Sequence, residues 1–482
     1  MKQNLVNTIL VAIGIISAFM HFEHFSKDLV SIHVWRQTQT QSTIDNFYEE
    51  DMNILNPRRN DRGNTEGIFR MEFPLMQWLV AVQYKIFGNH LIISRIFMFV
   101  IGLFSVLGIY RLLMALFNNS TLAIMGAWAL NFSPSFYYYT INPLPDNLAL
   151  CFSIWGLALF FNWYNHKKLS TLILSSLFLS MGALCKLPFI VFFIVPAFYF
   201  ANSIYRQRFN RKLFIEIACG MLLVILPLAW YISVVNNWEG NPIVKGMFDN
   251  KESFSKLLFY YQHNLFSTLP ELLLNYGSLL FFVAGFYFLI KNKSYNDSKF
   301  WPILSLCIAV LAYYFYESNA IADIHDYYLF PFFPLLFMLV AYGAFNIYKS
   351  EFKFAKILTI LLLLLLPFTC YLRMKSRWNT ESPGFNKDLL IYKSELRNAV
   401  AKDALVIAGN DDSHFIFLYY IDKKGWGFHN DEINPEKLKV LIEQGAEYLY
   451  TDAEKVIKDT AMSPYLNKLV LEKGSIKVYS LK

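Results

Sequence analysis

Short polar clusters interrupt the long apolar segments of this sequence, and they contain the residue types that could do chemistry. They are residues 33–40, 57–63, 72–75, 142–146, 186–188 and 325–328. A carboxylate such as Glu72 can take a proton from an attacking hydroxyl group. A cation such as Arg36 or Lys186 can neutralise a phosphate through charged hydrogen bonds. The clusters therefore suit chemistry at a phosphate-bearing compound, and a lipid-linked phosphate fits their position beside apolar segments.

The apolar segments between the clusters predict an all-α polytopic membrane domain. A transmembrane helix needs about 20 apolar residues, and about eleven segments qualify: 4–22, 91–115, 121–139, 147–164, 169–185, 188–203, 213–235, 271–290, 300–316, 328–348 and 355–373. Of the 482 residues, 55% are hydrophobic and 16% are charged, whereas an ordinary soluble domain has about 25% charged residues. The first segment has no small-residue cleavage site after it, so we interpret it as an uncleaved helix.

The distribution of basic residues predicts the orientation. Lysines and arginines gather in the loops 166–168, 206–212, 291–299 and 349–356, whereas the loops 140–146 and 317–327 have none. Basic loops prefer the cytoplasm. We therefore expect a multi-pass protein of the cell (inner) membrane with a cytoplasmic N-terminus and an extracytoplasmic tail. All the polar clusters then lie at the outer face.

Two regions are not predicted to span the membrane. The large outer loop 23–90 ends in the apolar stretch 73–87, which suits a helix lying in the interface. The tail alternates strands and helices and is typical of a small α/β domain. We expect strands at 404–408 and 447–451, a helix from Pro435 to Gly445, a helix over 453–468 and a strand pair over 469–481. The predicted domains are a membrane domain, 1–374, and an extracytoplasmic domain, 375–482.

Several classes of site and partner find no support in the sequence. The net charge of +7 is spread over short clusters, which fits membrane orientation and not nucleic-acid binding. No GxGxxG or GxxxxGK[ST] loop is present. The five cysteines lie in apolar segments without CxxC spacing, so no disulfide framework or zinc site is expected. No metal ligand is assigned, and a divalent metal is left open as a cofactor.

The order of these features resembles the GT-C glycosyltransferases that use polyprenyl-phosphate sugars, among them protein O-mannosyltransferases and the lipid A aminoarabinose transferase. Arg36-Gln37, followed by Glu72-Phe73-Pro74-Leu75, is similar to an Arg-Gln motif and an acid-x-Pro-Leu motif of bacterial members. The architecture is similar over roughly residues 1–370. The resemblance implies transfer of a sugar, with inversion, from a polyprenyl-phosphate donor to an acceptor glycan, lipid or protein at the outer face of the membrane.

The same resemblance implies roles for particular residues. Well-known members carry an acidic base just after the first span, but residues 36–40 hold no carboxylate. Glu72 is therefore the leading candidate for the catalytic base, followed by Asp45 and Asp61. The predicted substrate-binding residues are Arg36, Gln37, Asp146, Lys186, His325, Tyr327 and Tyr328. We expect Arg36 and Lys186 to contact the donor phosphate.

Each of these residues also has a structural interpretation that the sequence leaves open. Glu72 could cap a helix, Arg36 and Lys186 could extend to lipid headgroups, Asp146 could be an N-cap, and His325-Asp326 could form a solvated turn. Two other functions also remain: a transporter or flippase of a lipid-linked glycan, and a polysaccharide polymerase or ligase. Transporters usually show internal repeats and ionisable groups at the bilayer midplane. This sequence shows neither feature clearly, which favours an enzyme.

Overall fold

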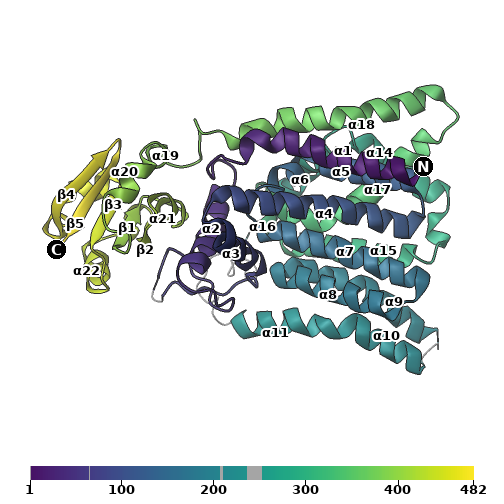
Figure 1. Ribbon diagram of the computed structural model, residues 1–482, viewed down its shortest axis with the longest axis horizontal. Coiled ribbons are helices and arrows are strands. Elements are labelled where there is room, and N and C mark those ends of the chain that lie inside the picture. Colours follow the sequence, from purple (N-terminus) through teal and green to yellow (C-terminus); the bar gives the residue numbers. More distant parts are fainter. Residues whose placement is uncertain (1, 64–65, 207–209, 236–251) are drawn as a thin grey trace. The chain divides into compact units, whose positions relative to one another are not determined.

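The computed structural model describes residues 2–63, 66–206, 210–235 and 252–482, and these residues form two compact units (Figure 1). The first unit, the membrane unit, comprises Met1–Phe25, Met71–Met76 and Ser94–Met374. The second unit, the polar unit, comprises Ser26–Arg70, Gln77–Ile93 and Lys375–Lys482. Each unit is described by itself below. The division into functional domains at residue 374 stays a prediction.

The membrane unit is a bundle of apolar helices, and the chain is a multi-pass membrane protein. Within the described residues, seven helical segments are long and apolar enough to cross a membrane: Asn4–His24, Leu91–Phe117, Pro145–His166, Leu187–Tyr205, Arg211–Val234, Asp326–Tyr348 and Lys353–Trp378. Three apolar helices are shorter: Leu169–Cys185 (α8), Leu279–Lys291 (α14) and Phe300–Tyr316 (α15). Figure 1 shows α1 (Gln3–His21), α4 (Leu91–Phe117), α7 (Pro145–His166) and α8 running roughly parallel.

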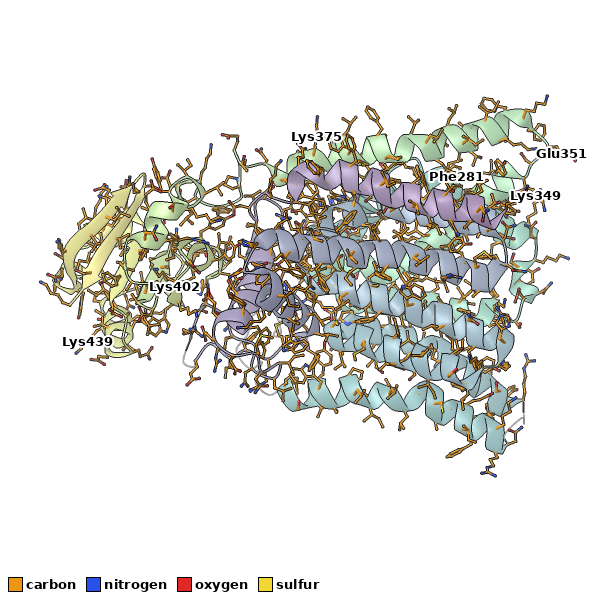
Figure 2. All side chains as sticks on the ribbon, in the orientation of Figure 1. Phe281, Lys349, Glu351, Lys375, Lys402 and Lys439 are labelled. Atoms are coloured by element: carbon orange, nitrogen blue, oxygen red, sulfur yellow. The ribbon has the colours of Figure 1, made fainter. Side chains whose placement is uncertain are left out.

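Close helix packing in the membrane unit depends on glycine at one contact. A Cβ atom at Gly343 of α17 (Phe333–Tyr348) would lie 1.9 Å from the carbonyl oxygen of Phe281 in α14, and Figure 2 labels Phe281. The two backbones can approach this closely only because position 343 has no side chain. Lys349 and Glu351, also labelled in Figure 2, lie in the loop that joins α17 to α18 (Lys353–Met374).

Prolines explain where the helices differ from the predicted spans. The expected span 121–139 is divided into α5 (Ser120–Asn131) and α6 (Pro134–Tyr139), because Pro134 has no N–H to continue the helix and takes its first turn. The expected span 271–290 is helical as α14 only from Leu279 and follows a π-helix, Asn264–Leu273, that contains Pro270. At Pro188, α8 gives way to a 3-10 helix, Leu187–Phe193, and then to α9 (Ile194–Tyr205).

The polar unit contains a five-stranded sheet with the strand order β2-β1-β3-β5-β4. Its strands are β1 (Leu405–Gly409), β2 (Lys424–Gly427), β3 (Tyr448–Thr451), β4 (Leu466–Lys473) and β5 (Ile476–Leu481). β1 pairs in parallel with β2 and β3, whereas β5 pairs antiparallel with β3 and β4. The predicted α/β domain is confirmed. As expected, Asn434 caps α22 (Pro435–Glu443) by accepting a hydrogen bond from the amide of Lys437, at 2.8 Å.

The prediction for residues 453–468 is wrong, because only Glu454–Lys458 (α23) forms an α-helix and β4 already begins at Leu466. Neither β2 nor the short helix α21 (Ile416–Ile421) was predicted from the sequence. The edge strand β2 is covered by part of the long loop. The amide of Gly425 donates to Asn60 O (3.0 Å), and the amide of Arg62 donates to Gly425 O (2.7 Å). This pairing protects an otherwise open sheet edge.

The polar unit also holds one α-helix of the described part of the loop 23–90 and most of a second. They are α2 (Val34–Glu49), which was not predicted from the sequence, and α3 (Leu75–Phe87), which was. Leu29 and Val34 contribute to the same apolar core as Val406 and Tyr450 of the sheet. Part of the loop is therefore folded together with the tail.

Candidate functional site

Four of the charged side chains that are buried in the membrane unit belong together, although they come from four separate segments. Their exposed fractions are 8% for Glu72, 1% for Asp146, 7% for Lys186 and 6% for Glu317. Ionisable groups among apolar membrane helices are expensive, so they are rare unless they are paired or functional. We call these four residues the charged cluster.

Lys186 and Asp146 form the centre of the charged cluster. Lys186 is an extended residue between the end of α8 at Cys185 and the 3-10 helix that contains Pro188. Its Nζ lies 3.8 Å from Asp146 Oδ1 and 5.1 Å from the ring centre of Tyr328. Burial and pairing make Lys186 a poor anchor for lipid headgroups.

The N-cap interpretation of Asp146 is wrong. The N-cap of α7 is Leu144, and no side chain caps the helix there. Asp146 lies within the first turn of α7, after Pro145, where the helix dipole stabilises a carboxylate. It thereby supplies a fixed negative charge beside Lys186.

Glu72 is held by its neighbours in the chain. The indole of Trp230 donates to Met71 O at 3.0 Å, and the amide of Phe73 donates to Leu184 O at 3.0 Å. The rings of Phe73 and Trp230 pack edge to face at 5.0 Å. These contacts fix the segment between the end of α8 and α11 (Ile225–Val234).

Two further groups connect Glu72 with Asp146. The hydroxyl of Tyr231 donates to Leu184 O at 3.1 Å. The carboxylates of Glu72 and Asp146 both act electrostatically on this hydroxyl and on the thiol of Cys185. The two carboxylates therefore border the same region of the membrane unit.

Glu317 is a member of the charged cluster that was not predicted from the sequence. It directly follows α15. Burial raises the pKa of its carboxyl group to about 7, and the positive charge of Lys186 partly opposes that rise. A carboxyl group that titrates near neutral pH can take up or release a proton during a reaction. One feature of the sequence could have identified Glu317: it directly follows an aromatic-rich span at the predicted outer face.

The turn at residues 325–328 is ordered by buried contacts, so the interpretation as a solvated turn is wrong. Asp326 is 4% exposed and accepts hydrogen bonds from Ser135 Oγ (2.9 Å) and from the hydroxyl of Tyr139 (2.5 Å). His325 Nδ1 lies 2.7 Å from Ala320 O, and burial lowers the pKa of this imidazole. His325 is therefore predominantly neutral at neutral pH.

The tyrosines of this turn have different surroundings. Tyr327 is 1% exposed, and its ring packs edge to face on Tyr139 at 5.6 Å. Tyr328 is half-buried, stacks on Tyr327 at 4.8 Å and faces Lys186. The structure thus brings Tyr328 into the charged cluster and gives Tyr327 a packing position behind it.

The remaining predicted site residues lie in the polar unit. Arg36 and Gln37 occupy the first turn of α2 and are 6% and 1% exposed. Arg36 Nη1 donates to Gln39 Oε1 at 2.5 Å, and Gln37 Nε2 donates to Ile32 O at 2.9 Å. Because Arg36 is buried, its side chain does not extend to lipid headgroups.

The two other predicted carboxylates have different environments. Asp45 accepts a hydrogen bond from Gln41 at 2.9 Å, and burial raises the pKa of its carboxyl group to about 7. It lines a cavity of about 630 Å³ together with Glu49 and Lys402, of which Figure 2 labels Lys402. Asp61 lies beside Gly425 at the covered edge of the sheet. Asp61 thus lies in the segment of the loop that pairs with the edge strand β2.

Metal-ligating side chains do not converge in the described part of the chain. No group of three histidine, cysteine, aspartate or glutamate side chains is arranged to hold a metal ion there. No residue is therefore assigned to a metal, and the divalent cation that the sequence left open gains no site from these residues.

Known proteins resemble this chain in sequence profile and in fold. The sequence profile of the family described as dolichyl-phosphate-mannose-protein mannosyltransferase matches residues 72–231, a range that includes Glu72, Asp146 and Lys186. Apo ArnT from Cupriavidus metallidurans superposes with a TM-score of 0.66 at 13% identity, covering 99% of this chain and 97% of ArnT. The chain has the GT-C glycosyltransferase fold.

Other GT-C structures are also similar. The oligosaccharyltransferase AglB from Archaeoglobus fulgidus gives a TM-score of 0.59 at 12% identity, covering 95% of this chain and 71% of AglB. The mycobacterial arabinofuranosyltransferase AftD gives 0.58 at 11% identity, covering 100% of this chain and 40% of AftD. Curated protein sequences give no significant match. The GT-C resemblance predicted from the sequence is confirmed.

Proposed function

We propose that this GT-C chain is a membrane glycosyltransferase that moves a sugar from a polyprenyl-phosphate donor to a glycan, lipid or protein acceptor. The observation that carries the proposal is the charged cluster: a buried lysine with three carboxyl groups, within and beside the segment that matches the mannosyltransferase family. ArnT has been solved with undecaprenyl phosphate, and AglB with a dolichol-phosphate. A donor of this class supplies its own activated sugar, so no nucleotide site is needed.

The reaction is a single displacement with inversion. A hydroxyl oxygen of the acceptor attacks the anomeric carbon, the bond from that carbon to the phosphate oxygen breaks, and polyprenyl phosphate leaves. The acceptor proton passes to a carboxylate. Negative charge grows on the departing phosphate oxygen, where a fixed cation lowers the barrier. Lys186 supplies that cation, and Asp146 holds its ammonium group in place.

Glu72 is the proposed base. It lies in the acid-x-Pro-Leu segment, it borders the same region as Asp146, and its backbone is fixed by Trp230 and Leu184. Asp146 is already engaged with Lys186, which makes it a positioning residue. Glu317 is the second candidate because its carboxyl group has a pKa of about 7.

The remaining predicted residues keep their proposed roles. Tyr328 and His325 border the donor phosphate beside Lys186, with Tyr327 behind them. Arg36 and Gln37 are proposed donor-binding residues of the polar unit. Asp45 and Asp61 are the alternative bases, and the tail supports acceptor binding or assembly.

The proposed location is the cell (inner) membrane, with a cytoplasmic N-terminus and an extracytoplasmic tail. Support comes from the basic loops 166–168, 206–212, 291–299 and 349–356. No observation favours a transporter or flippase, and the polymerase or ligase alternative would use the same donor chemistry.

The direct test is release of polyprenyl phosphate from a panel of polyprenyl-phosphate sugars by the purified full chain, with cell-envelope lipids and glycans as acceptors. Glu72→Gln keeps the shape of the side chain but removes the base, so turnover should fall by about 10²–10⁴-fold. Asp45→Asn and Asp61→Asn are the matched controls. If either control loses turnover while Glu72→Gln stays active, the catalytic base is not Glu72.

A stability measurement separates catalysis from helix capping at Glu72. If the carboxylate only caps α3, Glu72→Gln should lower the melting temperature and leave turnover unchanged. If it is the base, turnover should fall while undecaprenyl-phosphate binding is largely kept.

A further inference from the structure

A cavity of the membrane unit lies at the opposite end of α7 from the charged cluster. Its volume is about 650 Å³, and it includes His166, the last residue of α7. Asp146 lies 20 residues earlier in the same helix, which corresponds to about 30 Å at 1.5 Å per residue. This cavity, here called the basic cavity, is therefore separate from the proposed catalytic region.

The lining of the basic cavity is positive and partly apolar. The charged or titratable residues are Arg111, His166 and Lys299, and no aspartate or glutamate of the described chain lines it. Three amide side chains and five apolar residues complete the wall: Asn118, Asn162, Asn165, Met114, Ala115, Trp155, Ala158 and Leu159. Such a lining suits a ligand that has an anionic head and a hydrocarbon body.

Arg111 is the residue that most needs an explanation. It lies on α4 six residues before the helix ends at Phe117, about 9 Å along the axis. Its side chain is exposed, and in the described part of the chain it forms no hydrogen bond or ion pair. An arginine on a spanning helix is costly without a partner, and phosphate is the partner that its planar donor fork fits best.

Lys299 adds a second cation at a fixed position. Its Nζ donates to Ala115 O at 3.1 Å and to Leu116 O at 3.2 Å, at the C-terminal end of α4. These are neutral carbonyl groups, so the positive charge is held in place without being cancelled. An ammonium group has three donors, which leaves one for a ligand.

The apolar wall is fixed by contacts of its own. The indole of Trp155 donates to Phe104 O at 2.9 Å, and Asn165 Nδ2 donates to Ala115 O at 2.7 Å. These bonds join α7 to α4 across the cavity. Hydrogen bonds thus hold Trp155 and Asn165, which line the basic cavity, in fixed positions.

We propose that the basic cavity binds the phosphate headgroup of an anionic phospholipid, with an acyl chain along its apolar wall. Basic pockets between membrane helices suit acidic lipid headgroups. A free phosphate would use the same cations but would gain nothing from Met114, Ala158 and Leu159. In the orientation proposed above, the lipid belongs to the cytoplasmic leaflet, and the inference does not depend on the transferase activity.

Native mass spectrometry of the detergent-purified full chain tests the proposal, with phosphatidylglycerol or phosphatidylcholine added at equal concentration. The wild-type chain should retain phosphatidylglycerol preferentially. Arg111→Ala should weaken its apparent affinity by at least about tenfold, because a charged hydrogen bond to phosphate is lost. Lys353→Ala, which removes an exposed lysine outside the cavity lining, is the charge-matched control and should bind as the wild type does.

A second pair of variants keeps the test valid if Arg111→Ala folds poorly. Asn162→Asp introduces a negative charge into the cavity and should also weaken phosphatidylglycerol binding, whereas Asn162→Ala should not. Equal retention of the two lipids, or unchanged binding in both Arg111→Ala and Asn162→Asp, would overturn the proposal. Full displacement of the lipid by equimolar inorganic phosphate would assign the cavity to a free anion and would also overturn it.

Discussion

Replacement of Lys186 separates structural pairing from donor binding more sharply than any other single change. Its Nζ lies 3.8 Å from Asp146 Oδ1, and both side chains are less than a tenth exposed. At an effective dielectric constant of about 20, their attraction is about 4 kcal/mol. Lys186→Met would leave the carboxylate of Asp146 buried without its cation. Removal of one partner of a buried pair costs about 3–5 kcal/mol, so this variant should be strongly destabilised.

The double variant Lys186→Met with Asp146→Asn should recover most of that stability. Replacing a buried ion pair with neutral groups of similar volume is often close to neutral or even stabilising. Donor binding should not recover, because the cation that faces the phosphate is still absent. We expect the apparent dissociation constant for undecaprenyl phosphate to rise at least about tenfold in both variants.

Thermal unfolding in detergent and binding of fluorescently labelled undecaprenyl phosphate measure the two effects separately. The control is the more exposed pair Arg373–Glu271, which is joined at 2.6 Å. Arg373→Met should cost less stability than Lys186→Met and should leave donor binding unchanged. If the Lys186 double variant regains normal donor binding, Lys186 has only a structural role and the donor assignment is refuted.

The remaining predictions concern pH, orientation and the polar unit. The folded pKa of Glu317 is raised to about 7, so its contribution to stability is present below pH 4.5 and is lost as the pH rises through 7. Glu317→Gln should therefore be more stable than the wild type above pH 7 in thermal unfolding. A difference in melting temperature between the variant and the wild type that is the same at every pH would contradict the raised pKa of Glu317. Reporter fusions after residues 208 and 295 should give cytoplasmic signals, and a fusion after residue 400 an extracytoplasmic one; a cytoplasmic signal at 400 would reverse the topology. Arg36→Ala should raise the donor dissociation constant by at least about tenfold, and unchanged binding would remove Arg36 from the donor site.

Hydropathy and charge were sufficient for much of the architecture because they depend on the local sequence. The spans starting near residues 4, 91 and 147 are helices close to their predicted bounds. The cap at Asn434 and the hairpin over 469–481 also follow from residue types at fixed spacing. The polar clusters at 72–75, 142–146 and 186–188 were visible for the same reason.

Tertiary structure decided which of these residues meet. Glu317 has no motif around it, and its proximity to Lys186 depends on how α15 and the segment after α8 pack. The contact of Asn60 and Arg62 with β2 joins segments more than 350 residues apart, which no local pattern encodes. Apolar periodicity specifies that a helix will be buried in a membrane or a core, but many neighbours satisfy that requirement equally well. Burial and charge pairing arise only once particular neighbours are in contact, so only the tertiary structure shows that Lys186 is buried beside Asp146 and that Glu317 is buried near Lys186.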